Sequence, residues 1–285
     1  MKKLKDNCFN EFDPNALSID EALSNILKTI KVKSSSENVQ LKNSCDRILA
    51  KNIRSRIDVP NYKNSAMDGY AINIKDFSDP NKIFKCVGES FAGNSYTKAV
   101  KPNHAIKVMT GGNVPNSCNA VVMKELVEPY KDEIKVLAPI VKDQNIRFPG
   151  EDIRKNQVVL TKGKRINEID IGILASLGIA SVPVFKMPLI GFVSTGDELV
   201  SIKKKIKKNQ VYDSNRYLLH GLLRKYPVGV KDYGVVKDKL SSIEKEFSEA
   251  SKECDVLITT GGVSVGDADH VKTALENLGK IKFWK

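Results

Sequence analysis

The chain has 285 residues, so it is longer than a typical domain and is expected to form roughly two to three of them. Hydrophobic residues make up 41% and charged residues 28%, which is ordinary for a globular protein and excludes a wholly disordered chain. The net charge of +12 is compatible with nucleic-acid binding, but the basic residues are spread along the chain without interleaved aromatic side chains. We therefore expect no nucleic-acid partner, and the positive charge suits a small anionic ligand. The one dense run, Lys203–Lys208, is typical of a solvated loop.

The cysteines and histidines form no recognisable metal or disulfide pattern. The five cysteines include no C-x-x-C pair and their number is odd, and the three histidines have no ligand spacing. The N-terminus begins with basic residues but lacks the apolar run of a signal peptide. The longest apolar stretches, such as Leu189–Val193, are too short to span a bilayer. We therefore expect a cytoplasmic protein without a membrane partner.

The first part of the chain predicts a helix followed by a β-rich region. Ser18–Glu21 is a capping box, and apolar residues follow at helical spacing up to Ile30. From Asp58 to about Arg147, short apolar runs alternate with Gly, Pro and Asn clusters, which indicates a small β domain. Its predicted strands are Ile83–Val87, Ala105–Met109, Ala120–Lys124 and Glu133–Leu137.

A second helix is predicted over Asn167–Leu177, with Gly178 as its C′ residue, and regular strand–helix alternation begins after Pro188. Repeated strand–helix units imply a mostly parallel sheet with helices on both faces. The chain stops at Lys285, just as the last strand ends, so we expect a C-terminal truncation. The predicted strands are Leu189–Ser194, Val228–Val236, Val256–Thr260 and Ile281–Trp284, and the helices are Asn215–Lys225, Ser241–Ser251 and about Asp269 to Leu278.

Two loops leave the carboxyl ends of predicted strands, which is where open α/β sheets bind ligands. One loop contains Ser194, Thr195, Gly196, Asp197 and Glu198. The other is glycine-rich and precedes a helix, so its main-chain N–H groups and the helix N-terminus suit an anion such as phosphate. It matches neither the Walker A nor the G-x-G-x-x-G pattern, which disfavours kinases, GTPases and NAD enzymes. A tight turn without a ligand is the alternative. The predicted anion-binding residues of this loop are Gly261, Gly262, Ser264, Gly266 and Asp267.

Acidic residues follow several strand ends and are expected to gather on one rim of the sheet. Carboxylates repel phosphate unless a hard cation lies between them, and Mg²⁺ is the usual one. Each acid could instead cap a helix or lie in a solvated loop, and a helix cap is the stronger interpretation for Asp267. The acids on this rim are Asp197, Glu198, Asp238, Asp267 and Asp269.

Seven short stretches resemble the MoeA-type molybdopterin molybdenumtransferases, whose eukaryotic relative is the E domain of gephyrin. They run in the family's order over almost the whole chain, which is more specific than any single loop. A serine at position 214 replaces the threonine expected there. The stretches are Asn64–Ala71 (NSAMDGYA), Met109–Pro115 (MTGGNVP), Gly150–Ile153 (GEDI), Ala175–Ala180 (ASLGIA), Ser194–Leu199 (STGDEL), Tyr212–Arg216 (YDSNR) and Gly261–Asp267 (GGVSVGD).

The resemblance implies a multidomain α/β and β fold and an elongated homodimer. A doubly wound, molybdopterin-binding βα domain would span residues 188–285, and a small β domain would span residues 58–146. Residues 1–57 and 147–187 would form a mixed linker and dimerisation domain, and the family's C-terminal β domain is absent. The active cleft would lie between the βα domain of one subunit and the β domain of its partner. The carried-over catalytic residues are Asp68, Thr110, Asp152, Glu198, Asp238, Asp269 and Lys285.

The implied reaction inserts molybdenum from molybdate into adenylylated molybdopterin and releases AMP in the presence of Mg²⁺. Glu198, Asp238 and Asp269 would be the metal ligands, and Lys285 would neutralise molybdate or phosphate. Molybdopterin adenylyltransferase would supply the substrate, and molybdoenzyme apoproteins or their chaperones would be further partners.

Three alternatives from other classes stay open at this point. A hydrolase like the competence-damage-inducible proteins would not need the β domain that carries NSAMDGYA. A non-catalytic scaffold would favour loss of the site acids, which are all present here. A nucleic-acid module would bind DNA with steep salt dependence and would not bind adenylylated molybdopterin.

Overall fold

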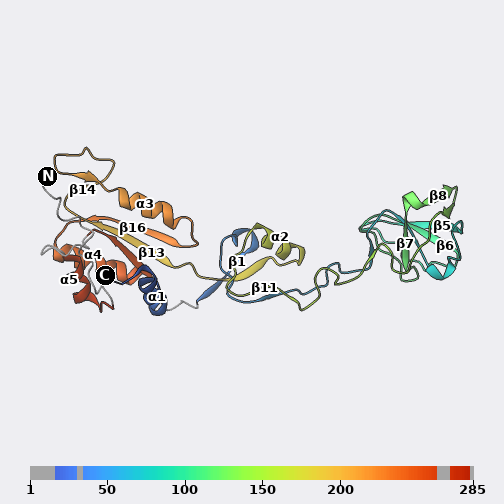
Figure 1. Cartoon of the computed structure of the whole chain (residues 1–285), viewed down its shortest axis with the longest axis horizontal. Helices are drawn as coiled ribbons and strands as arrows, with labels where there is room; N and C mark the ends of the chain where they lie inside the picture. Colours follow the sequence, from blue (N-terminus) through green and yellow to red (C-terminus); the bar gives the residue numbers. More distant parts are fainter. Residues whose placement is uncertain (1–16, 31–34, 262–269, 283–285) are drawn as a thin grey trace, which may run out of the picture. The chain divides into compact units, whose positions relative to one another are not determined.

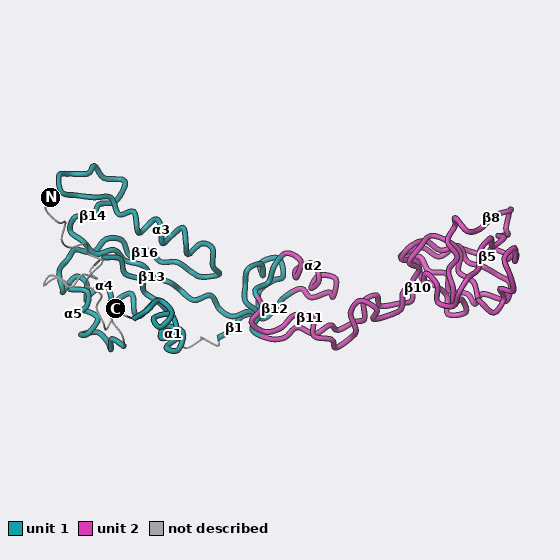
Figure 2. Tube along the Cα trace, viewed as in Figure 1, with its two compact units in different colours: residues 1–50, 165–167, 181–285 teal, residues 51–164, 168–180 magenta. Residues whose placement is uncertain are grey.

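The computed structural model describes residues 17–30, 35–261 and 270–282. It divides into two compact units, which Figure 2 colours separately. Unit 1 comprises residues 1–50, 165–167 and 181–285, and unit 2 comprises residues 51–164 and 168–180. Among the residues described, no helix has both the length and the apolar character needed to cross a membrane.

Unit 1 contains a three-stranded parallel sheet in the order β16-β13-β17. Parallel neighbours need crossover connections, and helices α3 and α4 provide them. Figure 1 shows α3 on one side of this sheet and α4 with α5 on the other. The elements are β13 (Leu189–Thr195), α3 (Ser214–Leu223), β16 (Gly229–Val236), α4 (Leu240–Glu253), β17 (Val256–Thr260) and α5 (His270–Leu278).

The core of this sheet lies against α4 and α5. The central strand β13 is buried from its second residue to its last, as expected for a parallel strand with neighbours on both edges. Ile243, Phe247 and Ala250 recur at helical spacing on α4 and are all buried. Ile243 and Phe247 pack with Val193 and Val236 of the sheet in one cluster. This cluster holds the strands in place, so their carboxyl ends form a fixed edge.

A helix, a 3-10 turn and two strand pairs complete the described part of unit 1. Helix α1 (Ile19–Thr29) begins with the predicted capping box, in which the Glu21 N–H donates to Ser18 Oγ at 3.2 Å. Strand β1 (Ser36–Gln40) pairs antiparallel with β12 (Ser181–Phe185), and a 3-10 turn, Leu41–Asn43, follows β1. Between β13 and α3, the strands β14 (Leu199–Val200) and β15 (Val211–Tyr212) pair in parallel.

Unit 2 is built around a six-stranded sheet in the order β7-β4-β6-β5-β9-β8. Successive residues of a strand point to opposite faces, and here both faces are covered. Ala71 belongs to one buried cluster and Ile72 to the other, and Val121 and Val122 divide in the same way. The strands are β4 (Gly69–Ile72), β5 (Ile83–Ser90), β6 (His104–Val108), β7 (Ala120–Met123), β8 (Val127–Tyr130) and β9 (Glu133–Val136).

Antiparallel ribbons and one helix form the rest of unit 2. Strand β3 pairs with β10, and β2 pairs with β11. Lys164 Nζ lies 2.7 Å from the buried carboxylate of Asp170 on helix α2. The elements are β2 (Ile53–Arg54), β3 (Asn64–Ser65), β10 (Ile146–Arg147), β11 (Val158–Leu160), α2 (Glu168–Ser176) and two 3-10 turns, Ile74–Asp76 and Lys124–Leu126.

The predicted fold class and most predicted elements are confirmed. The chain combines a parallel strand–helix sheet with a separate β-rich sheet, and the helices and strands match within a few residues. The predicted strand Ile281–Trp284 is wrong in its described part, because Ile281 and Lys282 are not in a strand and β17 pairs only with β13 among the described residues. A strand exists only through its ladder of hydrogen bonds. The predicted three-part domain boundaries stay a prediction.

Candidate active site

Buried hydroxyl groups mark the carboxyl edge of the parallel sheet in unit 1. Ser194 and Thr195 end β13 and are 1% and 3% exposed. Thr260, at the end of β17, donates its hydroxyl to Ser194 Oγ at 3.0 Å. The two neighbouring strands are thus linked at the point where both loops begin.

The glycine that follows β17 is required by its surroundings. Gly261 has a φ of +87°, and a Cβ there would lie 2.4 Å from the Thr195 carbonyl oxygen. Such a position tolerates only glycine, since L side chains rarely adopt this φ and the main chain of Thr195 cannot yield easily. The glycine-rich loop therefore starts in direct contact with the end of β13.

The loop after β13 folds the Glu198 carboxylate back towards the strand end. The Gly196 N–H donates to the Val236 carbonyl at 3.4 Å, which ties this loop to the end of β16. A Cβ built on Gly196 would lie 2.7 Å from Glu198 Oε1. The carboxylate of Glu198 thus occupies the space that a side chain at residue 196 would need.

One carboxylate oxygen of Asp238 is buried without a hydrogen-bond partner in the part of the chain that the structure describes. Its main-chain N–H donates to Asp197 Oδ1 at 3.3 Å, so the loops after β13 and β16 are in contact. Its Oδ1 atom is buried and has no hydrogen-bond partner within the described part of the chain. A buried acceptor without a partner is costly, by about 1–3 kcal/mol and more when it is charged. Such an atom is suited to a cation or to a donor on a ligand.

Several predicted residues of this edge lie outside the described residues. Their convergence with Glu198 and Asp238 stays a prediction. Within the ranges that the structure describes, no group of three or more His, Cys, Asp or Glu side chains is placed to hold a metal ion. The residues in question are Gly262, Ser264, Gly266, Asp267, Asp269 and Lys285.

A second buried acid stands at the start of α3. Asp213 is 2% exposed and caps α3, where its Oδ1 accepts the Arg216 N–H at 3.2 Å. Its Oδ2 is buried without a hydrogen-bond partner among the described residues. Arg216 Nε donates to both oxygens of Asp232, at 2.8 and 2.7 Å. The YDSNR stretch thus contributes a capped and ion-paired helix start.

In unit 2 the predicted residues Asp68 and Thr110 are in direct contact. The main-chain N–H and the hydroxyl of Thr110 both donate to Asp68 Oδ1 at 2.9 Å. Lys124 Nζ lies 3.8 Å from the other carboxylate oxygen. The two Thr110 donors, with a smaller contribution from Lys124, hold the pKa of Asp68 below its ordinary value. Asp68 is therefore an ionised, fixed carboxylate at neutral pH.

Main-chain bonds bring the NSAMDGYA and MTGGNVP stretches together. The Ser65 N–H donates to the Gly112 carbonyl at 2.9 Å, and the Gly111 N–H donates to the Ser65 carbonyl at 2.8 Å. Next to Asp68, a Cβ on Gly69 would lie 1.9 Å from the Val122 carbonyl oxygen, so β4 and β7 approach too closely for any other residue. The two motifs form one structural unit.

Asp152 is held by an arginine that sequence reasoning did not single out. Arg147 Nη2 donates to Asp152 Oδ1 at 2.6 Å, and its Nε donates to Glu151 Oε1 at 3.4 Å. Arg147 lies opposite Asn64 in the β10–β3 ribbon, so this cluster adjoins the NSAMDGYA stretch. The sequence signal that could have identified Arg147 is its position four and five residues before two consecutive acids.

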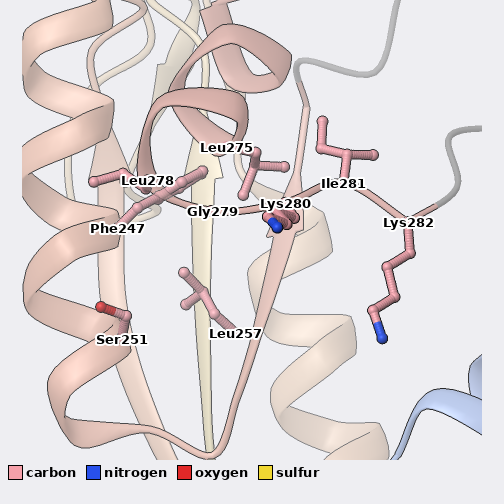
Figure 3. A pocket seen from close by; sticks show the side chains of 9 residues that line it. All are labelled: Phe247, Ser251, Leu257, Leu275, Leu278, Gly279, Lys280, Ile281 and Lys282. Atoms are coloured by element: carbon pink, nitrogen blue, oxygen red, sulfur yellow. The ribbon is translucent and has the colours of Figure 1, made fainter.

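A cavity in unit 1 has a mostly apolar lining. Its volume is about 450 Å³, and Figure 3 shows Phe247, Leu257, Leu275 and Leu278 lining it between α4, β17 and α5. Among the described residues that line it, the charged side chains are those of Lys280 and Lys282, and most of its wall is apolar. The chemistry-bearing residues lie at the carboxyl edge of the sheet instead.

Comparison with known proteins finds related sequences along nearly the whole chain. The family model of the MoeA N-terminal region (domain I and II) matches residues 17–178, and that of a probable molybdopterin binding domain matches residues 191–285. A molybdopterin molybdenumtransferase of Haemophilus influenzae is 39% identical over 270 residues, covering 94% of this chain and 67% of that protein. One from Staphylococcus aureus is 34% identical over 261 residues, covering 90% of this chain and 62% of its own length.

Solved structures give the same result. The crystal structure of the molybdopterin biosynthesis moeA protein from Pyrococcus horikoshii OT3 has a TM-score of 0.80 and 35% sequence identity. The match covers 85% of this chain and 65% of that one, so the chain spans about two thirds of the length of these relatives. With two family models that together match nearly its whole length, the chain belongs to the MoeA family of molybdopterin molybdenumtransferases.

Proposed function

We propose that the protein acts in molybdenum cofactor biosynthesis, as a transferase that inserts molybdenum from molybdate into adenylylated molybdopterin with release of AMP. The curated relatives carry the name molybdopterin molybdenumtransferase. The observation that supports this proposal most directly is the buried Oδ1 of Asp238, which has no partner among the described residues and lies beside a glycine-bounded strand edge. Such an edge combines main-chain N–H groups for a phosphate with a carboxylate that needs a positive partner.

The main chain of the glycine-rich loop would hold the phosphate of the pterin. Gly261 keeps the loop against the end of β13, so the N–H groups of Gly262, Ser264 and Gly266 would follow directly. The buried hydroxyl of Ser194 accepts the Thr260 hydroxyl, and Thr195 also lies close to the Thr260 carbonyl. These two side chains would fix the edge at which the ligand binds.

The acids at this edge fit Mg²⁺ by their chemistry. Magnesium prefers carboxylate oxygens and usually keeps several of its waters. The free Oδ1 of Asp238 would be one ligand, with Glu198 and Asp269 as the other predicted ones. When bound, the cation would supply charge neutralisation between these carboxylates and the adenylyl phosphate.

The remaining predicted residues would position substrates and balance charge. Glu198 would orient the attacking water or oxoanion, and Lys285 would neutralise molybdate or phosphate. Opposite charges about 4 Å apart interact by roughly 4 kcal/mol at an effective dielectric constant of 20, so such a contact affects binding strongly. We propose that Asp68, Thr110 and Asp152 serve the same reaction within a homodimer. Sedimentation of the full chain tests the dimer.

The test is AMP release from adenylylated molybdopterin in the presence of Mg²⁺ and molybdate. Asp238→Asn is expected to lose most of the molybdate-dependent release. The matched control is Glu249→Gln, which makes the same change on an exposed acid of α4 and should match the wild type. Equal activity of wild type and Asp238→Asn would refute the assigned role of Asp238. No AMP release by the wild type would refute the proposed reaction and leave a scaffold or another activity.

Partners follow from the chemistry of the substrate. Adenylylated molybdopterin must be made by an adenylyl-transfer reaction, so we propose a molybdopterin adenylyltransferase as the donor. Molybdoenzyme apoproteins or their chaperones would receive the product.

A further inference from the structure

A strongly basic loop lies between β14 and β15. This basic loop comprises residues 201–210, and Figure 1 shows it leaving β14 and returning towards α3. All five of its lysines are exposed, and in the described part of the chain none of them forms an ion pair with a carboxylate. Their charges are therefore uncompensated. The lysines are Lys203, Lys204, Lys205, Lys207 and Lys208.

Both ends of the basic loop are fixed to the candidate active site. The Val211 N–H donates to the Glu198 carbonyl at 2.9 Å, and the Asp213 N–H donates to the Val200 carbonyl at 3.1 Å. The loop therefore leaves from the segment that carries Glu198 and returns to the buried cap of α3. Its position relative to the strand edge is set by these main-chain bonds.

The lysines are close enough to act on a ligand at this edge. Lys203 is five residues from Glu198 along the chain, a contour distance of at most about 18 Å. The Debye length is about 10 Å at 0.1 M salt and about 30 Å at 0.01 M. The positive field of the loop therefore reaches the edge at low salt and is screened as the salt concentration rises.

The edge itself is acidic and would repel an anionic ligand at long range. Asp197, Glu198 and Asp238 come from two adjacent loops, and the Asp238 carboxylate has a buried oxygen without a partner among the described residues. The exposed lysines of the basic loop form no ion pair among the described residues and follow this acidic segment in the chain. An approaching anion would therefore meet positive charge before it meets the carboxylates. Clefts with such charge attract ions of opposite sign and raise association rates.

We propose that the basic loop captures the anionic pterin phosphate substrate electrostatically and speeds its association with the strand-edge site. This inference rests on the proposed function, which makes the substrate an anion. The lysines act before the ligand is bound, so the loop changes the association rate and leaves the chemical step unchanged.

The test is a charge-neutralising triple variant, Lys203→Gln/Lys204→Gln/Lys205→Gln, in the full chain. The matched control is Lys186→Gln/Lys252→Gln/Lys280→Gln, which removes three exposed lysines close to the amino ends of the parallel strands, away from the site. Both variants lower the net charge by the same amount. A difference between their association rates therefore depends on where the lysines lie and not on the total charge. Stopped-flow binding of adenylylated molybdopterin, at salt concentrations from 0.02 to 0.5 M (~25-fold range), gives the association and dissociation rates.

We expect the loop variant to associate about five- to tenfold more slowly than wild type at the lowest salt, with both rates converging at the highest salt. Its dissociation rate and the kcat for AMP release should equal those of the wild type. The control variant should follow the wild type throughout. A loop variant with unchanged association at low salt, or one that loses association equally at all salt concentrations, overturns the inference.

Two further outcomes separate this inference from its alternatives. If the wild type does not bind adenylylated molybdopterin at any salt concentration, the proposed function fails, and the inference fails with it. If the wild type releases AMP and both variants have wild-type kcat/KM, the function stands and the inference is wrong. Binding of duplex DNA that depends on these lysines, with substrate association unchanged, would assign the loop to nucleic acid and overturn the inference.

Discussion

The Oδ1 atom of Asp238, buried without a hydrogen-bond partner among the described residues, makes a prediction that does not depend on turnover. In the absence of Mg²⁺, Asp238→Asn removes a charge whose buried oxygen has no partner within the described chain, so the variant should be at least as stable as the wild type. A cation bound only by the folded protein stabilises it by about 2.7 kcal/mol at 100 times its Kd. At roughly 2–4 °C per kcal/mol, this raises the wild-type Tm by about 5–10 °C.

The assay is differential scanning calorimetry of both proteins over a Mg²⁺ titration. The wild-type Tm should rise with Mg²⁺ and that of Asp238→Asn should stay constant. Glu249→Gln, an exposed acid on α4, controls for the loss of one negative charge. The reasoning would be refuted if the variant showed the full Mg²⁺ shift. It would also be refuted if the variant unfolded several degrees below the wild type without Mg²⁺, because Asp238 would then have a structural partner.

Two further predictions follow from the geometry. Gly261→Ala should lower the free energy of unfolding by at least about 1–2 kcal/mol, since alanine at a φ of +87° is strained and its Cβ would lie 2.4 Å from the Thr195 carbonyl oxygen. Urea unfolding measures this loss. The control is Gly279→Ala, which should cost far less because the nearest atom to its Cβ is 3.8 Å away. Thr110→Val removes one of the two donors to Asp68, so the depressed pKa of Asp68 should move up towards its ordinary value, as followed by NMR titration. Because folding lowers the pKa of Asp68, its ionised carboxylate stabilises the folded state above the ordinary pKa of an aspartate. This stabilisation is lost as the pH falls through the lowered pKa of the folded state. The variant, in which the pKa is lowered less, should therefore lose less stability on acidification. An unchanged Asp68 pKa in Thr110→Val would show that the main-chain N–H alone sets it.

Local sequence patterns predicted the secondary structure well. The capping box at Ser18 and the helical spacing on α4 depend on nearby residues, so they can be read directly. The parallel sheet followed from the alternation of strands and helices. The strand predicted at Ile281 does not form in its described part, because pairing of an apolar run with a sheet depends on tertiary packing, which a local pattern does not show.

The sequence motifs named candidate residues, but they did not show which of these residues are in contact. Asp68 and Thr110 were named from motifs, but the bond between them spans 42 residues of sequence and depends on how β4 and β6 pair. Arg147 and the unpaired oxygen of Asp213 were not identified, because ion pairs and burial arise from tertiary packing. Motifs thus named the candidate residues, and only the structure showed which donors the described acids have.

Gly69 has a consequence for how the β-rich unit meets a ligand. Because β4 and β7 approach more closely than a Cβ allows, the strand that follows Asp68 has no room to shift against its neighbour. The Lys124 N–H donates to the Asp68 carbonyl at 3.1 Å, while Thr110 holds the carboxylate from the other side. The acid is therefore ordered before any ligand arrives, so little conformational entropy remains to be lost on binding, and the affinity of this surface is governed by desolvation and charge.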